Sequence, residues 1–450
     1  MTFMIAFLDC TTSVEKGTAQ IAKMGASVCL RVTSALFVAL LASGHLAIAQ
    51  QQSYTWPQIR DKFENTNPTL QADSLNVQES KAQEITAFLR PNPDLGLSVD
   101  GTQIAPNRGV WQPFSGTFET PSVSQLIERR HKRHLRLESA KKGTVIAESN
   151  HTDLERTLLF NLRNAFVSAL QSKAVLQLAK DNLAYWDHIL EISRTRFQAG
   201  DMAQIDLDRL ELQRVQYESD VQTAEVNLRT AKIQLLTLLN DRSPIEEFDV
   251  TGTYDFNDQL QSPDEFRKIA LDTRPDLRAA IQAVDKAQTD HKLAIANGST
   301  DPTLSGWYTH NSSTNNPFAI NTIGVSVNIP LRIFDRNQGE KLRTQLDIKR
   351  SEKLREAAEA QVLSDVDSGY ATVDSTLILL RPYKAKYLDM SVRVRDTVLF
   401  SYQHGGASLL DFLNAESDYR SVQLNYVNLV GSYLTAAAQL NMAVGQEVIQ

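Results

Sequence analysis

Apolar positions through the middle of the chain recur at alternating spacings of four and three, which is typical of a heptad seam between long helices. In the first half this stripe is interrupted only by two serines: Leu158, Leu162, Ala165, Ala169, Ser172, Leu176, Ala179, Leu183, Trp186, Leu190, Ser193 and Phe197. The same spacing resumes after Gly200 and again after Gly405. Each stretch therefore predicts a long coiled-coil hairpin whose two helices turn at a glycine.

The two halves of the chain repeat each other. Residues after Gly200 return after Gly405 at a constant offset of 205 positions. The identical pairs include Gln198/Gln403, Asp206/Asp411, Glu211/Glu416, Thr230/Thr435 and Leu235/Leu440. Because the matches keep their order, the chain is predicted to be two copies of one unit of roughly 200 residues.

A different periodicity comes just before each long helix. Leu95, Leu97 and Val99 alternate with polar or small residues, and the alternation returns over residues 323–329. Such alternation predicts strands with one apolar face, hence two strand hairpins and four strands per chain. Five nearby aromatic residues are candidates for an interface belt: Trp111, Phe114, Phe118, Trp307 and Tyr308.

Four strands are too few for a membrane barrel, which needs about eight, so insertion into lipid would require several chains to share one barrel. Two exposed hairpins in water are the alternative. The expected fold class is therefore mainly α, with duplicated long antiparallel helical hairpins and a β portion of four strands.

The patterns divide the chain as follows. We expect a signal peptide over 1–49, with an N-terminal extension over 1–23. The first repeat covers 50–240, with a short helix, a strand hairpin at 94–121 and a helical hairpin at 124–240, and is followed by a connection over 241–265. The second repeat covers 266–450, with a short helix, a strand hairpin at 303–330 and a helical hairpin at 336–445. Pro382 lies inside the last of these and should kink its first helix.

The N-terminus carries the signs of secretion. The apolar run Val32–Ala42 follows Lys23 and Arg31 and precedes a small-x-small pattern at residues 47–49, which is typical of a secretory signal peptide. Met24 is then the expected start of translation. Cleavage would also remove the only two cysteines, Cys10 and Cys29, which excludes a disulfide framework and a cysteine zinc site.

Composition narrows the function further. The chain has 46 basic and 53 acidic residues, a net charge of −7, which disfavours binding to nucleic acid. The catalytic motifs of hydrolases, zinc proteases and phosphate-binding loops are absent from the sequence. We therefore expect neither an enzyme nor a bound cofactor or metal.

Three segments resemble a known family. They are the turns Phe197–Asp206 (FQAGDMAQID) and Tyr402–Asp411 (YQHGGASLLD), and the strand-to-helix passage Ile329–Gly339 (IPLRIFDRNQG). With the duplicated plan, they make the chain similar to the outer membrane efflux protein (TolC-like) family over essentially its whole length after residue 49. The last passage is similar to the branch that serves heavy-metal cation exporters.

The resemblance implies a homotrimer in the outer membrane, with a 12-stranded barrel continuous with a periplasmic tunnel of 12 helices. Its role would be the exit duct of a tripartite efflux system, with a periplasmic adaptor protein and an inner-membrane pump of the RND type as partners and outer-membrane lipid around the barrel. The outer-membrane duct of a type I protein secretion system, and a periplasmic coiled-coil adaptor without a barrel, remain alternatives. Whether the cargo is a metal cation, a drug or a polypeptide stays open.

The same resemblance assigns roles to particular residues. Gly200 and Gly405 would permit the tight turns, and the adaptor-facing tips would carry Ala203, Ser408 and Leu409. Asp411 would point into the closed aperture, where the family's second acidic ring is matched by Asn414, and Asp206 and Tyr402 would link neighbouring helices. The alternative for Asp206 and Asp411 is a solvated carboxylate in the first turn of a helix, favoured by the helix dipole.

Overall fold

The computed structural model describes residues 52–311, 318 and 320–449. Ser53–Gln450 form one compact unit. The expected signal peptide over 1–49 lies outside the described residues. Within them, no helix combines the length and the apolar character that crossing a membrane would require.

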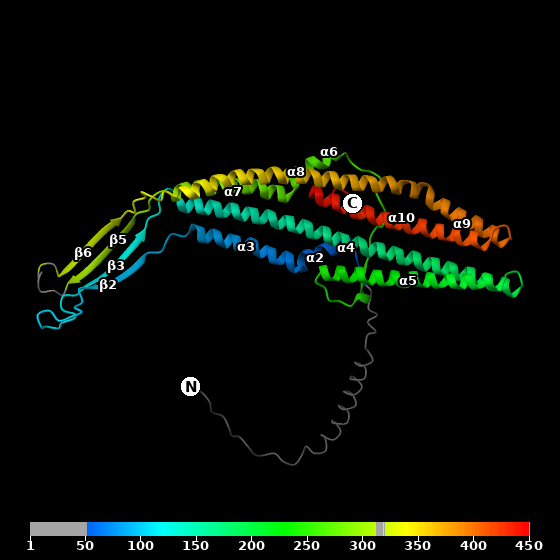
Figure 1. The fold of residues 1–450 in the computed structure, drawn as a ribbon, viewed down its shortest axis with the longest axis horizontal. Coiled ribbons are helices and arrows are strands. Elements are labelled where there is room, and N and C mark those ends of the chain that lie inside the picture. Colours follow the sequence, from blue (N-terminus) through cyan, green and yellow to red (C-terminus); the bar gives the residue numbers. More distant parts are fainter. Residues whose placement is uncertain (1–51, 312–317, 319, 450) are drawn as a thin grey trace, which may run out of the picture. The chain divides into compact units, whose positions relative to one another are not determined.

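Each half of the unit has the same order of elements, a helix pair, a strand pair and a second helix pair (Figure 1). The first half contains β1 (Gln52–Tyr54), α2 (Trp56–Thr66), α3 (Pro68–Phe88), β2 (Asp94–Asp100), β3 (Phe118–Leu126), α4 (Lys132–Gln198) and α5 (Gln204–Leu238). The second contains η1 (Ile245–Glu247), β4 (Phe248–Val250), α6 (Pro263–Thr273), α7 (Pro275–Asn297), β5 (Thr303–Asn311), β6 (Asn321–Asn328), α8 (Gln338–Pro382), η2 (Tyr383–Tyr387), α9 (Leu388–Gln403) and α10 (Leu409–Val444).

The single short helix expected before each strand pair is in fact two helices. The breaks fall at Asn67–Pro68 and at Arg274–Pro275, with Asn67 and Arg274 in extended conformation. A proline disfavours helical geometry in the residue before it and itself fits the first turn of a new helix. The same local rule therefore divides both repeats at matching positions.

The first long helix begins later than expected. Strand β3 continues to Leu126, so α4 starts at Lys132 rather than at Ser124. The cause is pairing with the other repeat, because Ser124 lies opposite Ser305 and Leu126 opposite Thr303. Pairing with a distant strand thus extends β3 beyond the end that the local pattern indicated.

The four strands form one antiparallel sheet in the order β2-β3-β5-β6. Residues directly opposite each other share a face, and the register places Leu95 with Val123 and Leu304 with Val327 on one apolar face. Leu97 and Val325 are each 78% exposed there. The sheet therefore has one exposed apolar face along its whole width.

The aromatic belt expected from the sequence is not one group. Trp111 and Phe114 lie in the loop between β2 and β3. Trp307 lies on the opposite, serine-rich face, where its ring covers Gly324 so closely that a Cβ there would be 2.2 Å from the ring. Among the strand residues Trp307 and Tyr308, only Tyr308 lies on the apolar face.

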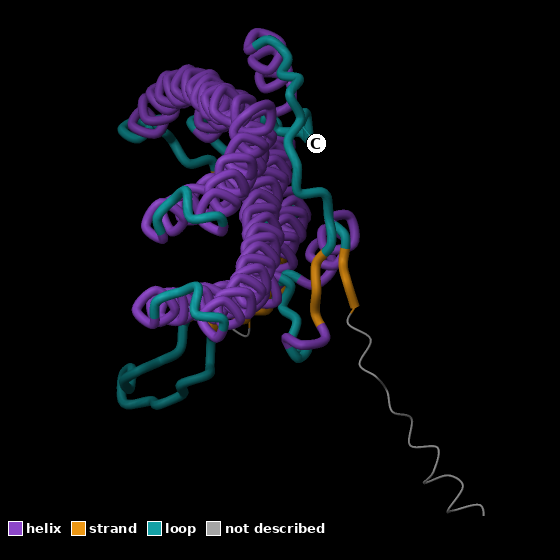
Figure 2. Tube along the Cα trace, turned by 90° about the vertical axis from the view of Figure 1, so that its right-hand side faces the viewer, coloured by secondary structure: helices purple, strands orange, loops and turns teal. Residues whose placement is uncertain are grey.

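The helices stand side by side in a curved single layer, with the sheet at one end and the two helix turns at the other (Figures 1 and 2). In the half near the sheet the neighbours are α3, α4, α7 and α8, whereas towards the turns α4 packs against α5 and α10. The apolar seams lie in these contacts, and none of their positions is exposed. The core is accordingly divided into separate clusters along the layer.

The second hairpin does not contain one continuous α-helix. Regular α-helix ends at Pro382 and is followed by the π-helical turn η2 before α9. A proline lacks the N–H of the helical ladder, and a π-turn is one way to accommodate the interruption. The interruption expected at Pro382 is present in this form.

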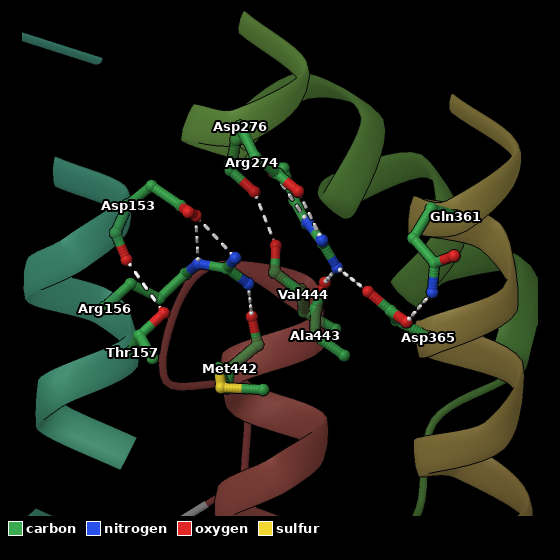
Figure 3. A network of polar contacts seen from close by, with 11 residues as sticks. Asp153, Arg156, Thr157, Arg274, Asp276, Gln361, Asp365, Met442, Ala443 and Val444 are labelled. Carbon is green, nitrogen blue, oxygen red and sulfur yellow. Dashed lines mark hydrogen bonds and ion pairs between the residues drawn. The ribbon is translucent and has the colours of Figure 1, made fainter. Parts of the chain in front are cut away.

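Arginine side chains donate hydrogen bonds to the last backbone carbonyls of α10, where the two repeats meet (Figure 3). Arg156 of α4 donates to the carbonyl of Met442, and Arg274 donates to that of Ala443 at 3.1 Å. Arg274 also donates to Asp276 at 2.5 Å and 2.9 Å and to Asp365 of α8 at 2.8 Å. The last carbonyls of a helix have no partner within it, so these arginines tie α10 to both neighbours.

Arg274 is the central group of this network, since its side chain is only 3% exposed. Burial acts to raise the pKa of Asp276, but hydrogen bonding and attraction from Arg274 outweigh it and lower that pKa. A lowered pKa means that the ion pair stabilises the fold above the ordinary carboxyl pKa of 3.8 and is lost as the pH falls through the folded value.

Replacing Arg274 should therefore be costly. Arg274→Ala leaves Asp276 and Asp365, whose side chains are 30% and 33% exposed, without their cation and removes the donor to the Ala443 carbonyl. We expect a loss of about 2–3 kcal/mol in unfolding free energy at pH 7. The exposed pair of Arg267 with Asp367 joins the same two helices, so Arg267→Ala is the matched control and should change stability far less. Denaturant unfolding followed by circular dichroism measures both, and equal losses would contradict a central role for Arg274.

Candidate functional site

Both helical hairpins end in turns that require glycine. Gly200 has φ +85° and Gly405 has φ +77°, and no atom outside their chain neighbours lies within 4 Å of a Cβ built on either. The strain that another residue would suffer is therefore in the backbone rather than in packing. The two turns lie side by side at the same end of the helical layer (Figure 1).

A groove of about 480 Å³ lies between the two turns. It brings together most of the residues to which the sequence assigned a role at the tips or the aperture, together with two arginines: Ala203, Asp206, Tyr402, Gly405, Ser408, Leu409, Arg196 and Arg209. Gly200, Asp411 and Asn414 are not part of its lining. The expected site is thus largely one place in the fold, with Asp411 and Asn414 on the exposed side of α10.

The expected tip residue Leu409 is largely buried. It is 7% exposed and packs in a cluster with Trp186 and Phe412, whereas Leu410 is 63% exposed. The first turn of α10 directs one leucine towards α4 and the next towards solvent. Leu409 thus lines the groove with little exposed surface, and Leu410 is the leucine that the first turn of α10 presents to solvent; a contact of Leu409 with an adaptor stays a prediction.

Asp411 and Ser408 cap the start of α10. The Asp411 N–H donates to Ser408 Oγ at 3.1 Å, while the Ser408 N–H and hydroxyl donate to Asp411 Oδ2 at 3.0 Å and 2.7 Å. These hydrogen bonds from Ser408 lower the pKa of Asp411. Asp411 is exposed and ionised. Its carboxylate therefore caps the helix and is also accessible to solutes.

Asp206 and Tyr402 face the same groove without a hydrogen bond between them among the described side chains. Burial raises the pKa of Tyr402, with Arg196 opposing that rise and Asp206 adding to it. Arg196 lies 5.6 Å from the Tyr402 ring centroid, within cation–π range. Arg196 belongs to α4 and Tyr402 to α9, so this contact joins the two hairpins.

Four aromatic rings form a continuous stack across the two hairpins. Tyr217 of α5 stacks on Trp186 of α4 with centroids 4.9 Å apart, and Trp186 stacks on Phe412 of α10 at 6.0 Å with nearly parallel planes. Phe412 in turn stacks on Tyr402 of α9 at 5.5 Å. Every helix of the two hairpins contributes one ring.

The stack is buried and closed at both ends by cations. Trp186 and Phe412 are 0% exposed, and the Trp186 indole N–H donates to the Leu210 carbonyl at 3.1 Å. At one end Arg420 lies 4.3 Å from the centroid of the Tyr217 ring. At the other end Arg196 lies 5.6 Å from the centroid of the Tyr402 ring. The sequence placed Trp186, Tyr217 and Phe412 on seams, but a seam position does not reveal which rings will meet across hairpins.

The two hairpins are packed unequally near their turns. The last part of α4 buries Trp186, Ile189, Leu190 and Ser193, whereas α9 buries Ser391 alone. Ser391 occupies the place that Trp186 has in the first repeat. Helix α9 is therefore less well packed than the matching part of α4, and it is attached chiefly by Tyr402 and by partly buried apolar residues.

Glu416 is a residue that sequence reasoning missed. It is 2% exposed on α10, and neither carboxylate oxygen has a hydrogen-bond partner of normal geometry in the described ranges. Its equivalent in the first repeat, Glu211, is exposed and accepts from Arg194 at 2.8 Å. Because the two glutamates are identical in sequence, only the packing distinguishes them.

Comparisons with known proteins identify similar chains. A family model described as outer membrane efflux protein matches residues 60–241 and 267–446. The cobalt-zinc-cadmium resistance protein CzcC of Cupriavidus metallidurans is 21% identical over 85% of this chain and 87% of its own length. The outer membrane protein TolC of Escherichia coli K12 is 21% identical over 91% of this chain and 85% of its own.

Solved structures share the fold. A structure of CusC, reported with transmembrane channel formation, has a TM-score of 0.74 at 17% identity and covers 87% of this chain and 92% of its own. The outer-membrane channel OprN has a TM-score of 0.71 at 16% identity, covering 87% of this chain and 89% of its own. At these identities the likeness establishes the mainly helical fold with its strand pairs.

Truncating the ring at the centre of the stack should weaken the contact between hairpins. We expect Phe412→Ala to cost about 3–5 kcal/mol, because it leaves a cavity between Trp186 and Tyr402. Phe412→Leu keeps apolar volume and should cost far less, since it loses mainly the stacking contribution of about 0.5–1.5 kcal/mol. Denaturant unfolding of the detergent-solubilised protein checks the order, and a stability for both variants equal to that of the unmodified protein would show that the Phe412 ring contributes nothing to the contact.

Proposed function

The chain belongs to the outer membrane efflux protein family, and from that membership we propose that it is the passive exit duct of a tripartite efflux system. It resides in the cell outer membrane and extends into the periplasm. The proposed role is conduction, with the energy supplied by an inner-membrane pump of the RND type and a periplasmic adaptor between the two.

The exposed apolar face of the four-stranded sheet is the observation that carries this proposal. Residues such as Leu97 and Val325 are 78% exposed there, and an apolar face this wide is not left in water. Four strands cannot close on themselves in lipid, where every backbone group needs a partner. Three chains supplying 12 strands would form one closed barrel with the apolar face outward and the serine-rich face inward.

The shape of the helical layer is the argument for the proposed periplasmic tunnel. It is curved and a single helix thick (Figure 2), a form that three copies could close into a tunnel beneath the barrel. The turns at Gly200 and Gly405 would then be the entrance and the surface for the adaptor, with Ala203, Ser408 and the exposed Leu410 at the tips. Leu409, which lines the groove between the turns, stays a predicted contact beside Leu410.

The proposed gate combines a mobile hairpin with a charged ring. Helix α9 is less firmly packed than the matching part of α4, so hairpin α9–α10 would be the one that moves outward when the adaptor favours an open arrangement. Three copies of Asp411 near the axis would repel anions and attract cations. Asn414, one turn further, adds no second charge, so the closed aperture would depend on Asp411 together with the contact between Arg196 of α4 and the ring of Tyr402.

The cargo is proposed only by likeness. The relative CzcC is named for cobalt, zinc and cadmium resistance, and the passage Ile329–Gly339 is similar to the same branch. Efflux of divalent metal cations is therefore our first candidate. Choice of cargo would rest with the pump rather than with the duct.

Planar-bilayer recording of the purified protein, paired with its mass in detergent, tests the duct. We expect a trimer with a small, cation-preferring conductance. A detergent-independent monomer without conductance would refute the barrel and leave a coiled-coil adaptor as the better description.

The gate has its own test. Asp411→Ala combined with Tyr402→Ala removes the charge and the ring that Arg196 contacts across the hairpins, and single-channel conductance should rise severalfold. Asp411→Ala with Tyr402→Phe preserves the stacked ring and is the matched control, which should rise less. Unchanged conductance in the first variant would place the constriction elsewhere in the molecule.

A further inference from the structure

Glu416 lies where four helices meet, close to the aromatic stack. It belongs to α10 and is 2% exposed, and both carboxylate oxygens are buried without a hydrogen-bond partner of normal geometry in the described part of the chain. The buried hydroxyl of Tyr185, on α4, also lacks such a partner. Two buried polar groups from opposite hairpins thus remain unsatisfied in the same region.

The cations around Glu416 are already engaged with other groups. On α9, Arg395 pairs with Asp396 at 2.9 Å and lies 4.1 Å from the Tyr419 ring and 4.7 Å from the Tyr185 ring. Its guanidinium is therefore held by another carboxylate and two aromatic faces.

The remaining neighbours come from α5 and α10. Arg420 of α10 pairs with Asp220 of α5 and lies 4.3 Å from the ring of Tyr217. The Tyr217 hydroxyl interacts with Glu416 only weakly. The groups facing Glu416 are thus Tyr185 on α4, Tyr217 and Asp220 on α5, Arg395 and Asp396 on α9, and Tyr419 and Arg420 on α10, and none of them neutralises it directly.

A carboxylate in such a place is costly when ionised and tolerable when neutral. Burial raises the pKa of Glu416 to about 7, with Arg395 and Arg420 acting in the opposite direction. Burial raises the pKa of Tyr185 to about 12, so that hydroxyl stays neutral. The packed hairpins therefore favour a protonated Glu416, whereas separated hairpins would expose it to water and favour the ionised form.

We propose that Glu416 is a proton-binding site that couples separation of the two helical hairpins to the pH of the surrounding solution. This inference rests on the proposed exit duct, since separation of α9–α10 is its gating movement. On separation the carboxyl O–H bond breaks, the proton passes to water and the electron pair stays on the carboxylate. On closing, the carboxylate takes up one proton.

The direction of the effect follows from linkage. Below the ordinary glutamate pKa of 4.5, Glu416 is protonated in both arrangements and the equilibrium is independent of pH. Between about 4.5 and about 7, each rising pH unit shifts the equilibrium towards separation by up to tenfold, because only the separated form has lost its proton. Above about pH 7 both forms are ionised and the dependence ends.

The test compares open probability in planar bilayers between pH 4.5 and pH 8. For the unmodified protein we expect a rise of at least about tenfold between pH 5 and pH 7 and a plateau above. Glu416→Gln is neutral at every pH and should lose this dependence and remain as closed as the unmodified protein at low pH. Asp418→Asn, which removes an exposed carboxylate from the same helix, is the matched control and should keep the dependence.

A pH dependence that survives in Glu416→Gln would overturn the inference. Should that variant not fold, as judged by its mass and circular dichroism, Glu416→Met supplies the same comparison with an apolar side chain. Loss of the dependence in either variant, with retention in Asp418→Asn, supports the inference.

The distance between spin labels on the two turns tests the role of Glu416 independently of conductance. The sequence has no cysteine after Cys29, so Asp201→Cys and Gln403→Cys place spin labels on the two turns without competing thiols. If no conductance is found at any pH, the duct proposal fails, and the label separation then decides the role of Glu416. A separation that increases from pH 5 to pH 7 and is fixed in Glu416→Gln supports the proton site, and an invariant separation in both refutes it.

Discussion

Every long helix of this chain buries only a narrow seam, so each needs a neighbour along its whole length. Helix α4 has 67 residues, about 100 Å at the usual rise of ~1.5 Å per residue, and a helix of this length cannot fold back on a compact core. Its seam is covered by α3 and α7 towards the sheet and by α5 and α10 towards the turns. The layered form, the divided core and the placing of the α4–α5 and α9–α10 turns at one end follow from this requirement.

Two kinds of contact then fix the layer where the repeats meet. Near its middle, Arg156 and Arg274 supply the hydrogen bonds that the end of α10 lacks. Near the turns, the stack from Tyr217 to Tyr402 joins all four helices through apolar surface. The middle is held by buried ion pairs that require exact partners, while the turn region is held by ring faces that can slide. That difference suits a structure anchored at its centre and adjustable at its entrance.

Local patterns in the sequence were sufficient for much of the architecture. The heptad seams, the glycine turns and the strand alternation each depend on residues close together in the chain, and the structure has them at the expected places. One error was local, because Pro68 and Pro275 each divide a helix that was expected to be single. The other errors arise from contacts between segments that are distant in the sequence. The end of β3 is set by pairing with β5, and the orientation of Trp307 is set by its contact with the neighbouring strand.

In the candidate site, too, local sequence patterns do not predict contacts between distant segments. Gly405 and Tyr402 could be assigned from their motif, whereas Glu416 could not, because its environment is composed of side chains from four helices. Its counterpart Glu211 has the same identity in the repeat and an ordinary exposed ion pair. Composition and spacing are equal for the two, and only the assembled packing raises the pKa of one carboxyl.

The unequal pair Trp186 and Ser391 has a consequence for how such a protein can change over generations. A tandem copy begins with identical halves, and any substitution that improves rigidity in both would also stiffen whatever has to move. Once the halves diverge, one can accumulate bulky, well-fitted residues while the other keeps small ones, as at these two positions. Duplication thus lets the two halves of one chain differ in packing, as they do at Trp186 and Ser391, whereas identical copies of a single unit would share every substitution.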